Sequence, residues 1–225
     1  MNDDAPKLTS EGRKPPEAKD DPATAAAFAA HREDPILRFE RLLEVARKDP
    51  RQRDPTAMAL ATVGEDGRPS SRIVLLKGVD AGGFVFYTNL DSRKGRDLQS
   101  HGSVALTFHW QWLEVQVRVE GEVAQVGDAE ADAYFAGRPR GSQLGAWASH
   151  QSGVLASRGE LEDRLVAVTA RFEGVPVPRP ERWSGFRVPP RAIEFWRNRE
   201  SRLHDRELYT RAAPDAPWRL ELLYP

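Results

Sequence analysis

The sequence of 225 residues predicts a mainly β protein with peripheral helices, folded as an antiparallel barrel in one domain. Many short apolar segments follow one another through short turns, with few helical segments between them, as in an antiparallel sheet. In the segment from Leu113 to Val119, apolar residues alternate with polar ones, which predicts a strand with one buried face. A chain of this length can bury a substantial core.

The N-terminal region divides into a polar tail and a helix. Residues 1–25 are rich in Asp, Lys, Pro and Ala and have no apolar periodicity, so we expect a disordered tail there and a single domain over residues 26–225. A helix is predicted from Pro35 to Lys48. Asp34 is its expected cap, Pro35 suits the first turn, and the apolar residues fall on one face.

The remaining elements follow in order. Asp66-Gly67 is a hairpin signal between the first two strands. Strands are predicted from the apolar and β-branched runs at 56–63, 71–77, 83–89, 103–110, 112–126, 192–197, 206–211 and 218–225. Further helices are predicted at 92–100 with Ser92 as cap, at 128–138 with Asp128 as cap, and at 157–172 with a capping box of Ser157 and Glu160. The Pro-rich segment 174–183 is predicted to be a loop.

The composition narrows the classes of function. Lys and Arg number 33 and Asp and Glu number 34, so a general nucleic-acid or membrane-surface binder is not expected. The absence of Cys excludes disulfides, thiolate catalysis and Cys-based zinc sites. The five His residues show no metal-ligand spacing, so no metal is expected. The polar N-terminus and the lack of an apolar run of about 20 residues lead us to expect a cytoplasmic protein without a membrane partner.

Basic residues nevertheless gather at three places. Arg93 and Lys94 open a predicted helix, where cations oppose the helix dipole unless an anion binds there. Arg138 follows Tyr134 by four residues, so the two share a helix face. The third place is the segment 194–206, with the sequence EFWRNRESRLHDR. Each residue taken singly fits a solvated or core position. Together they suggest a ligand with more than one phosphate, or two phosphorylated ligands.

Several motifs carry a family resemblance. The segments RIVLLK, FYTN, SRKGRDL, QVRVEG, YFAGRPRGSQLGAWAS and EFWRNRESRLHDRELY, spread over residues 54–225, closely resemble the pyridoxine (pyridoxamine) 5'-phosphate oxidases. The resemblance implies a split β-barrel homodimer with flavin mononucleotide (FMN) at the subunit interface. It also implies oxidation of pyridoxine or pyridoxamine 5'-phosphate to pyridoxal 5'-phosphate, with dioxygen as acceptor and hydrogen peroxide as product. The flavin would carry the hydride chemistry, and the protein would supply position and electrostatics.

The resemblance also implies roles for individual residues. The residues expected to bind FMN are Arg72, Ile73, Val74, Leu75, Leu76, Lys77, Tyr87, Thr88, Arg93, Lys94, Gln116, Gln151, Ser152, Trp196 and Arg206. The residues expected to bind substrate are Lys77, Tyr134, Arg138, Ser142, Arg202, Leu203 and His204. Of these, Lys77, Tyr134, Arg138 and Ser142 would hold the substrate phosphate. Arg202 and His204 would face the pyridine ring and are the candidate catalytic groups.

Two departures and three alternatives accompany this interpretation. Val115 stands where the family often has Arg, and the segment around His31 lacks the family's Arg- and Tyr-containing stretch, which can cover the substrate. A phenazine-biosynthesis FMN oxidase of the same superfamily is the nearest alternative, although the complete phosphate set favours the vitamin B6 substrate. A non-catalytic flavin or pyridoxal-phosphate carrier would need the same phosphate contacts. A barrel that binds single-stranded nucleic acid does not fit the neutral net charge.

Overall fold

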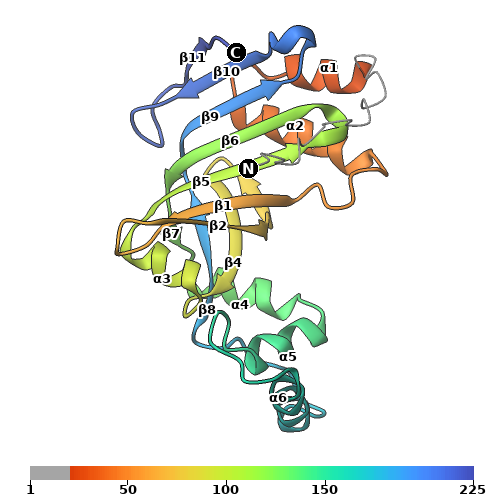
Figure 1. Cartoon of the computed structure of the whole chain (residues 1–225), viewed down its shortest axis with the longest axis vertical. Helices are drawn as coiled ribbons and strands as arrows, with labels where there is room; N and C mark the ends of the chain where they lie inside the picture. The colour runs from red at the N-terminus through yellow and green to blue at the C-terminus, as the bar shows by residue number, and fades with distance from the viewer. Residues whose placement is uncertain (1–20) are drawn as a thin grey trace, which may run out of the picture.

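The computed structural model describes residues 21–225, which form two antiparallel sheets surrounded by helices (Figure 1). The seven-stranded sheet has the order β11-β10-β9-β6-β5-β1-β2, and the four-stranded sheet has the order β3-β4-β8-β7. The strands thus form two separate sheets rather than one closed cylinder, which is the split β-barrel arrangement. The predicted fold class is confirmed.

The boundaries of the elements are as follows. The strands are β1 (Ala57–Val63), β2 (Pro69–Leu75), β3 (Gly78–Asp80), β4 (Gly83–Asn89), β5 (Ser103–Trp110), β6 (Val115–Glu122), β7 (Ala124–Gln125), β8 (Trp183–Val188), β9 (Pro190–Arg197), β10 (Asp205–Thr210) and β11 (Arg219–Leu222). The α-helices are α1 (Pro22–Ala29), α2 (Pro35–Lys48), α3 (Arg93–Ser100), α4 (Asp128–Ala136), α5 (Arg140–Ala148) and α6 (Arg158–Arg171). Two short 3-10 helices are η1 (Gln111–Leu113) and η2 (Glu200–Arg202).

The core lies between the two sheets, and α2 inserts into it. The Phe39 ring of α2 lies 4.8 Å from the ring of Phe84 on β4 and 4.8 Å from that of Phe108 on β5. All three side chains are buried. The predicted alternation on β6 is confirmed, because Val115 and Val117 both point into this core. An Arg at position 115 would place a charge there, so Val suits this chain.

The helix caps follow the sequence in most cases. Asp34 accepts hydrogen bonds from the backbone N–H groups of Ile36 and Leu37, and Ser92 accepts one from Gly95. Ser157 accepts one from Glu160, as the capping box predicts. The prediction of Asp128 as a cap is wrong, because Gly127 occupies the cap position and Asp128 is the first helical residue. Its carboxylate still favours the positive end of the helix dipole.

The structure adds elements that the sequence pattern did not reveal. Residues 22–25 of the expected tail belong to α1. Asp21 caps this helix, because its carboxylate accepts a hydrogen bond from the backbone N–H of Thr24. The Ala-rich composition of α1 hides its periodicity. The expected tail over residues 1–20 lies outside the described residues. Strand β8 was missed because Gly185 interrupts a short apolar run, and Gly weakens a strand prediction. α5 and β3 were also missed, and the predicted strand 112–126 is divided among η1, β6 and β7.

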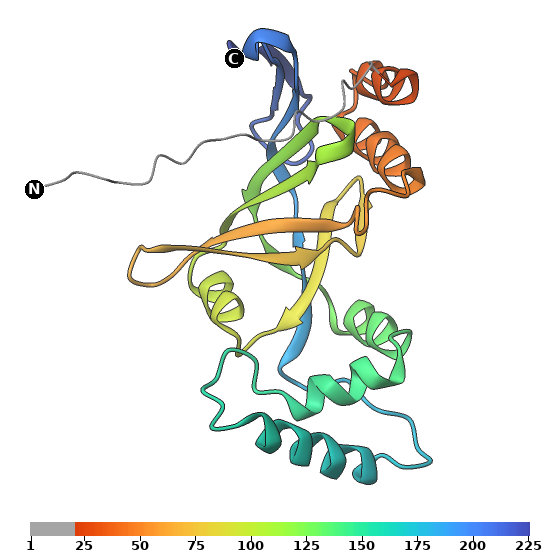
Figure 2. The ribbon, with the colours of Figure 1, turned by 45° about the vertical axis from the view of Figure 1, so that its right-hand side comes forward.

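The two ends of the molecule are built from different elements. Helices α4, α5 and α6 lie together at one end, whereas β10, β11 and α1 lie at the other (Figures 1 and 2). Strands β4 and β8 run from the core toward α4, so the two ends are connected through the four-stranded sheet. No helix within residues 21–225 is long and apolar enough to cross a membrane.

A buried arginine ties α1 and α2 to the C-terminal strands. Arg38 is fully buried, and its Nη1 donates to Glu207 Oε2 at 2.8 Å and to the Tyr209 hydroxyl at 2.9 Å. Its guanidinium carbon lies 4.4 Å from the ring centroids of both Phe28 and Phe195. The charge is thus paired through Nη1 and enclosed by aromatic faces, which partly compensates its removal from water, while Nε and Nη2 have no hydrogen-bond partner among the described residues.

We expect Arg38→Met to lower the free energy of unfolding by about 3 kcal/mol, because it removes the buried partner of the Glu207 carboxylate, which then keeps only the half-exposed Arg32 at 3.2 Å. The control is Arg41→Met on the exposed face of the same helix, where the ion pair with Glu44 contributes at most about 1 kcal/mol. Chemical denaturation followed by circular dichroism measures both. Equal losses in the two variants would contradict a structural role for Arg38.

Candidate functional site

A cavity of about 420 Å³ opens where the four-stranded sheet meets α3, α4 and α5. Its lining residues are Ile73, Val74, Leu75, Lys77, Tyr87, Thr88, Asn89, Lys94, Tyr134, Arg138, Ser142, Gly145, Ala146, Ser149, Gln151 and Trp183. A second hollow beside it shares Leu75, Lys77, Tyr134, Arg138 and Ser142. The lining contains three cationic side chains and no carboxylate, so the cavity is an electropositive site for an anion.

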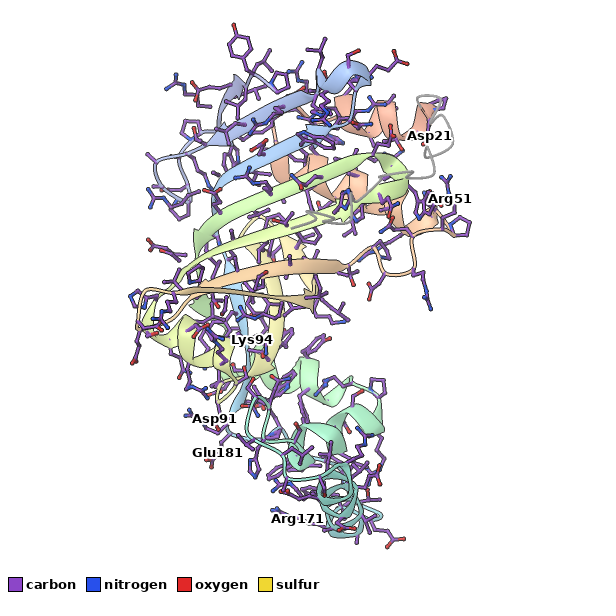
Figure 3. The ribbon with its side chains drawn as sticks, in the orientation of Figure 1. Asp21, Arg51, Asp91, Lys94, Arg171 and Glu181 are labelled. Carbon is purple, nitrogen blue, oxygen red and sulfur yellow. The ribbon has the colours of Figure 1, made fainter. Side chains whose placement is uncertain are left out.

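Lys94 occupies the inner wall, at the junction between the sheets and the helical end (Figure 3). Its Nζ donates to Thr88 Oγ1 at 3.1 Å, Ser92 Oγ at 3.2 Å and Gln151 Oε1 at 3.0 Å. All three acceptors are neutral. Burial lowers the pKa of Lys94, and the nearby charge of Arg72 lowers it further. An anion bound at this nitrogen would relieve both effects.

The backbone at the start of α3 lies very close to the end of β4. A Cβ at Gly95 would lie 2.4 Å from the carbonyl oxygen of Leu90, so only Gly allows the helix to begin this close to the end of β4. That packing sets Lys94 against Thr88 of β4. The prediction that the SRK segment forms a helix start beside Tyr87 and Thr88 is therefore supported by the geometry.

Arg138 also lines the cavity, two residues after the end of α4. Its Nη1 is buried and has no hydrogen-bond partner among the described residues. Burial lowers its pKa, while the Tyr134 phenol opposes that shift. Tyr134 and Ser142 line the cavity on either side of it in sequence, so these three side chains meet Lys77 in one hollow, as the sequence predicts. A buried guanidinium N–H without an acceptor is available to an external oxygen.

Other predicted cofactor residues surround this cavity without all lining it. Arg72 donates through Nη1 to Thr62 Oγ1 at 2.6 Å, and its Nη2 lies 3.7 Å from Asp97 Oδ2. Arg93 lines a smaller hollow beside the β1–β2 hairpin. Ser152 adopts a positive φ of 70° in the loop after α5, next to Gln151. Leu76 is buried in the core, whereas Ile73 is 65% exposed on the edge strand β2.

The second group of predicted residues lies on β6, β9 and β10 and in the loop before β10. Gln116 of β6 pairs with Trp196 of β9, and Trp196 pairs with Arg206 of β10. The rings of Trp196 and His204 are 4.5 Å apart. His204 Nδ1 accepts the backbone N–H of Arg199 at 3.2 Å, which leaves Nε2 as the other ring atom available for a ligand.

Arg206 is held by a carboxylate. Its Nε donates to Glu194 Oε1 at 2.7 Å, and Glu194 Oε2 accepts from Arg118 Nη1 at 3.0 Å. The hydrogen bond to Glu194 raises the pKa of Arg206. Glu194 is buried, so this pairing fixes the direction of the Arg206 guanidinium on the sheet face.

The loop before β10 has an unusual backbone. Ser201 and Arg202 have φ values of 55° and 61°, in the left-handed region that side chains other than Gly seldom adopt. Leu203, which follows, is 68% exposed. Strain of this kind gathers at functional sites, and it projects the RLH segment outward from the end of the strand.

The structure does not bring the two groups together within one protomer. Neither the cavity nor the neighbouring hollow includes Gln116, Trp196, Arg202, Leu203, His204 or Arg206. The β10 end and the α4–α5 end lie apart (Figures 1 and 2). Within the described residues of one chain, the two groups therefore do not line a common hollow.

Sequence reasoning missed five cavity residues, namely Asn89, Gly145, Ala146, Ser149 and Trp183. Ser142, Gly145, Ala146 and Ser149 are spaced by three, one and three residues, which puts small side chains on one helix face. That spacing was a detectable signal for α5. Trp183 had no such signal, because it lies at the start of the missed strand β8.

As the pH is raised, we expect the affinity for inorganic phosphate to begin to fall at a lower pH in the wild type than in Lys94→Arg. The lowered pKa means that Lys94 loses its charge below the ordinary lysine range, whereas Arg stays protonated. Calorimetric titration of the ligand-free protein at increasing pH measures the difference, and Lys77 is the same in both proteins. Identical pH profiles would show that Lys94 does not hold the anion.

Comparisons with known proteins match the chain along most of its length. Residues 49–172 match the family model described as pyridoxamine 5'-phosphate oxidase, and residues 183–225 match the pyridoxine 5'-phosphate oxidase C-terminal dimerisation region. A relative from Myxococcus xanthus, named pyridoxine/pyridoxamine 5'-phosphate oxidase, is 59% identical over 204 residues, covering 89% of this chain and 98% of the relative. One of the same name from Rubrobacter xylanophilus is 56% identical, covering 85% and 87%.

Solved structures show the same fold. PhzG from Burkholderia lata, in complex with tetrahydrophenazine-1-carboxylic acid, is 34% identical with a TM-score of 0.81, covering 88% of this chain and 96% of that one. A pyridoxamine 5'-phosphate oxidase-related, FMN-binding protein from Nostoc punctiforme is 17% identical with a TM-score of 0.66, covering 83% and 95%. At that identity the second likeness concerns the fold alone.

Proposed function

The chain belongs to the pyridoxamine 5'-phosphate oxidase family, and from that premise we propose that it oxidises pyridoxine or pyridoxamine 5'-phosphate to pyridoxal 5'-phosphate. FMN is the proposed cofactor and dioxygen the proposed electron acceptor, with hydrogen peroxide as product. The observation that carries the proposal is the cavity in which Lys77, Lys94 and Arg138 meet with no carboxylate in its lining. Two phosphorylated ligands would supply the anionic partners that these cations lack within the cavity.

The residues present fit a flavin mononucleotide. The Lys94 Nζ, surrounded by neutral acceptors, suits a single terminal phosphate at the start of α3. Ile73 and Leu75, exposed on β2, offer apolar and backbone contacts to a flat ring. When bound, the flavin supplies the hydride acceptor and passes electrons to dioxygen. The protein binds and orients both ligands.

On the substrate side, Arg138, Tyr134, Ser142 and Lys77 would hold the phosphate. This contact is remote from the reacting carbon, but it orients the substrate against the flavin. Arg202 and His204 would approach the pyridine ring. Because Nδ1 of His204 is engaged by the backbone, Nε2 is the atom that would hold or move a proton there.

We propose that each complete site is shared between two protomers of a homodimer. The phosphate-binding cavity would come from one protomer, and Trp196, His204 and Arg206 would come from the other. The second group lies in the segment matched by the dimerisation-region model, which supports this arrangement. It also explains why one protomer keeps the two groups apart.

A phenazine-type oxidase is the second candidate, because the PhzG structure resembles this chain over most of both lengths. The vitamin B6 substrate is favoured by the relatives above 50% identity and by the phosphate-binding hollow. A non-catalytic carrier would bind the same ligands without turnover. A cytoplasmic location remains an expectation from the sequence.

The central experiment is to purify the protein, identify the released flavin and add pyridoxine 5'-phosphate in air. We expect a yellow protein that releases FMN, and formation of aldehyde and peroxide in equal amounts. A colourless protein that takes up no added FMN would refute the proposal. Flavin and ligand binding without oxygen consumption would instead indicate a carrier.

The two groups of basic residues should separate by mutation. Arg138→Ala should retain FMN and raise the apparent KM for pyridoxine 5'-phosphate by about one to two orders of magnitude, since a charge-assisted hydrogen bond contributes roughly 1.5–3 kcal/mol. Arg206→Ala should instead weaken FMN binding or alter its spectrum. Steady-state kinetics and flavin content of both variants test this. Loss of FMN with normal KM in Arg138→Ala would show that the division is wrong.

A shared site also predicts complementation. Co-expression of Arg138→Ala and Arg206→Ala chains with different tags should give heterodimers with one intact and one doubly altered site. Random pairing should then restore about a quarter of the wild-type activity in the mixed population at subsaturating substrate. Purification through both tags isolates the heterodimer for assay. Activity no higher than in the separate variants would exclude a site shared in this way.

A further inference from the structure

Three aromatic rings form a parallel stack at the edge of the cavity. The ring centroid of Tyr87 on β4 lies 3.9 Å from that of Tyr134 on α4, with an interplanar angle of 3°. It lies 5.3 Å from the ring centroid of Trp183 on β8, with an interplanar angle of 7°. Tyr134 and Trp183 are 6.2 Å apart at 4°. The stack therefore links both central strands of the four-stranded sheet to the helix that precedes Arg138. Offset stacking of this kind stabilises a defined ring orientation.

The backbone of β8 is adapted to this stack. A Cβ at Gly185 would lie 2.7 Å from two ring carbons of Tyr87, closer than van der Waals contact allows. Tyr87 pairs directly with Gly185 across the sheet. The residue that weakens the prediction of β8 is thus the one that allows the Tyr87 ring to lie flat. Burial, together with the nearby Glu130, raises the pKa of Tyr87 to about 12, so the phenol stays neutral in the stack.

Arg138 rests on the same stack. Its guanidinium carbon lies 4.8 Å from the Trp183 ring centroid and 5.4 Å from that of Phe135. Two other arginines near this region are held by carboxylates. Arg179 pairs with Asp128 and Asp132, and Arg187 pairs with Asp80 and Glu130. Arg138 has no such ion pair among the described residues, and its Nη1 has no acceptor.

The difference has a physical consequence. A carboxylate would orient Arg138 but would also neutralise it and compete with a phosphate for its N–H groups. An aromatic face attracts the cation through its quadrupole and occupies none of those N–H groups. The ring can therefore hold the guanidinium in place while its charge and donors stay available to a ligand.

We propose that Trp183, supported by Tyr87 and Gly185, is a positioning residue that holds Arg138 and Tyr134 for the substrate phosphate. This inference rests on the proposed function. Trp183 acts through Arg138 and sets the preference for phosphorylated over unphosphorylated substrate. The closest alternative is that Trp183 only packs the small cluster around Phe135, Leu144 and Phe172.

The test compares Trp183→Leu and Trp183→Phe with the control Trp147→Leu. Trp147 belongs to the same cluster, and the guanidinium carbon of Arg171 lies 4.8 Å from its ring centroid, the same distance as between Arg138 and Trp183. Trp147 does not line the cavity. Each flavin-loaded variant is assayed with pyridoxine 5'-phosphate and with pyridoxine. The Kd of pyridoxal 5'-phosphate is measured separately by absorbance titration, and thermal unfolding reports stability.

We expect Trp183→Leu to raise the KM for pyridoxine 5'-phosphate and the Kd of pyridoxal 5'-phosphate about tenfold, as expected for loss of a desolvated cation–π contact. The kcat/KM for unphosphorylated pyridoxine should stay within about twofold, and Trp183→Phe should recover most of the affinity, because both effects depend on the ring. Trp147→Leu should lower stability without changing either constant. If Trp183→Leu does not fold, Gly185→Ala serves in its place, since its Cβ displaces Tyr87.

Three results would overturn the inference. These are equal losses for phosphorylated and unphosphorylated substrate, the same change in Trp147→Leu, and unchanged constants in Trp183→Leu.

Failure of the proposed function would give different results, which concern the wild type. A wild-type protein that binds pyridoxal 5'-phosphate but oxidises nothing would refute the oxidase, while the Kd comparison would still decide the role of Trp183. A wild type without turnover or binding would refute both.

Discussion

Positive charge held in a partly buried cavity without a neutralising carboxylate is the constraint on which the site depends. Burial disfavours the charged form of Lys94 and of Arg138, and the pKa of each is lowered accordingly. The chain supports these charges with neutral groups, namely hydroxyl and amide oxygens around Lys94 and aromatic faces around Arg138. The cost is offset when an anion binds. Ligands with phosphate groups should therefore stabilise the fold by mass action as well as occupy the site.

The two groups of site residues handle charge in opposite ways. Arg206 is paired with Glu194, so its guanidinium is fixed in direction and its charge is largely compensated. That state suits hydrogen bonding to the edge of a flat ring system. Arg138 is fixed in direction without being compensated, which suits a phosphate. The proposed assignment of Arg206 to flavin and of Arg138 to substrate phosphate thus agrees with the partners that each arginine has in the protomer.

Much of the fold was predictable because it depends on local patterns. The alternation from Leu113 to Val119, the Asp66-Gly67 turn and the Asp34 cap all act within a few residues, and each is found as predicted. Strand β8 was not predictable, because Gly185 is explained by the Tyr87 ring from another strand. The residues proposed to bind phosphate could be grouped through the family motifs. The separation of the cavity from the β10 end depends on topology, which residue spacing does not encode.

The split of the barrel into two sheets gives each sheet a separate part of the proposed chemistry. The four-stranded sheet supplies Tyr87, Thr88 and Trp183, and so it determines how phosphate groups are held. The seven-stranded sheet supplies the pairs Gln116–Trp196 and Trp196–Arg206, which we propose face the flavin. Phe39 of α2 packs against both sheets and fixes their relative position. Changes on β8 should therefore alter phosphate recognition with little effect on the flavin-facing strands, and the reverse should hold for β9 and β10.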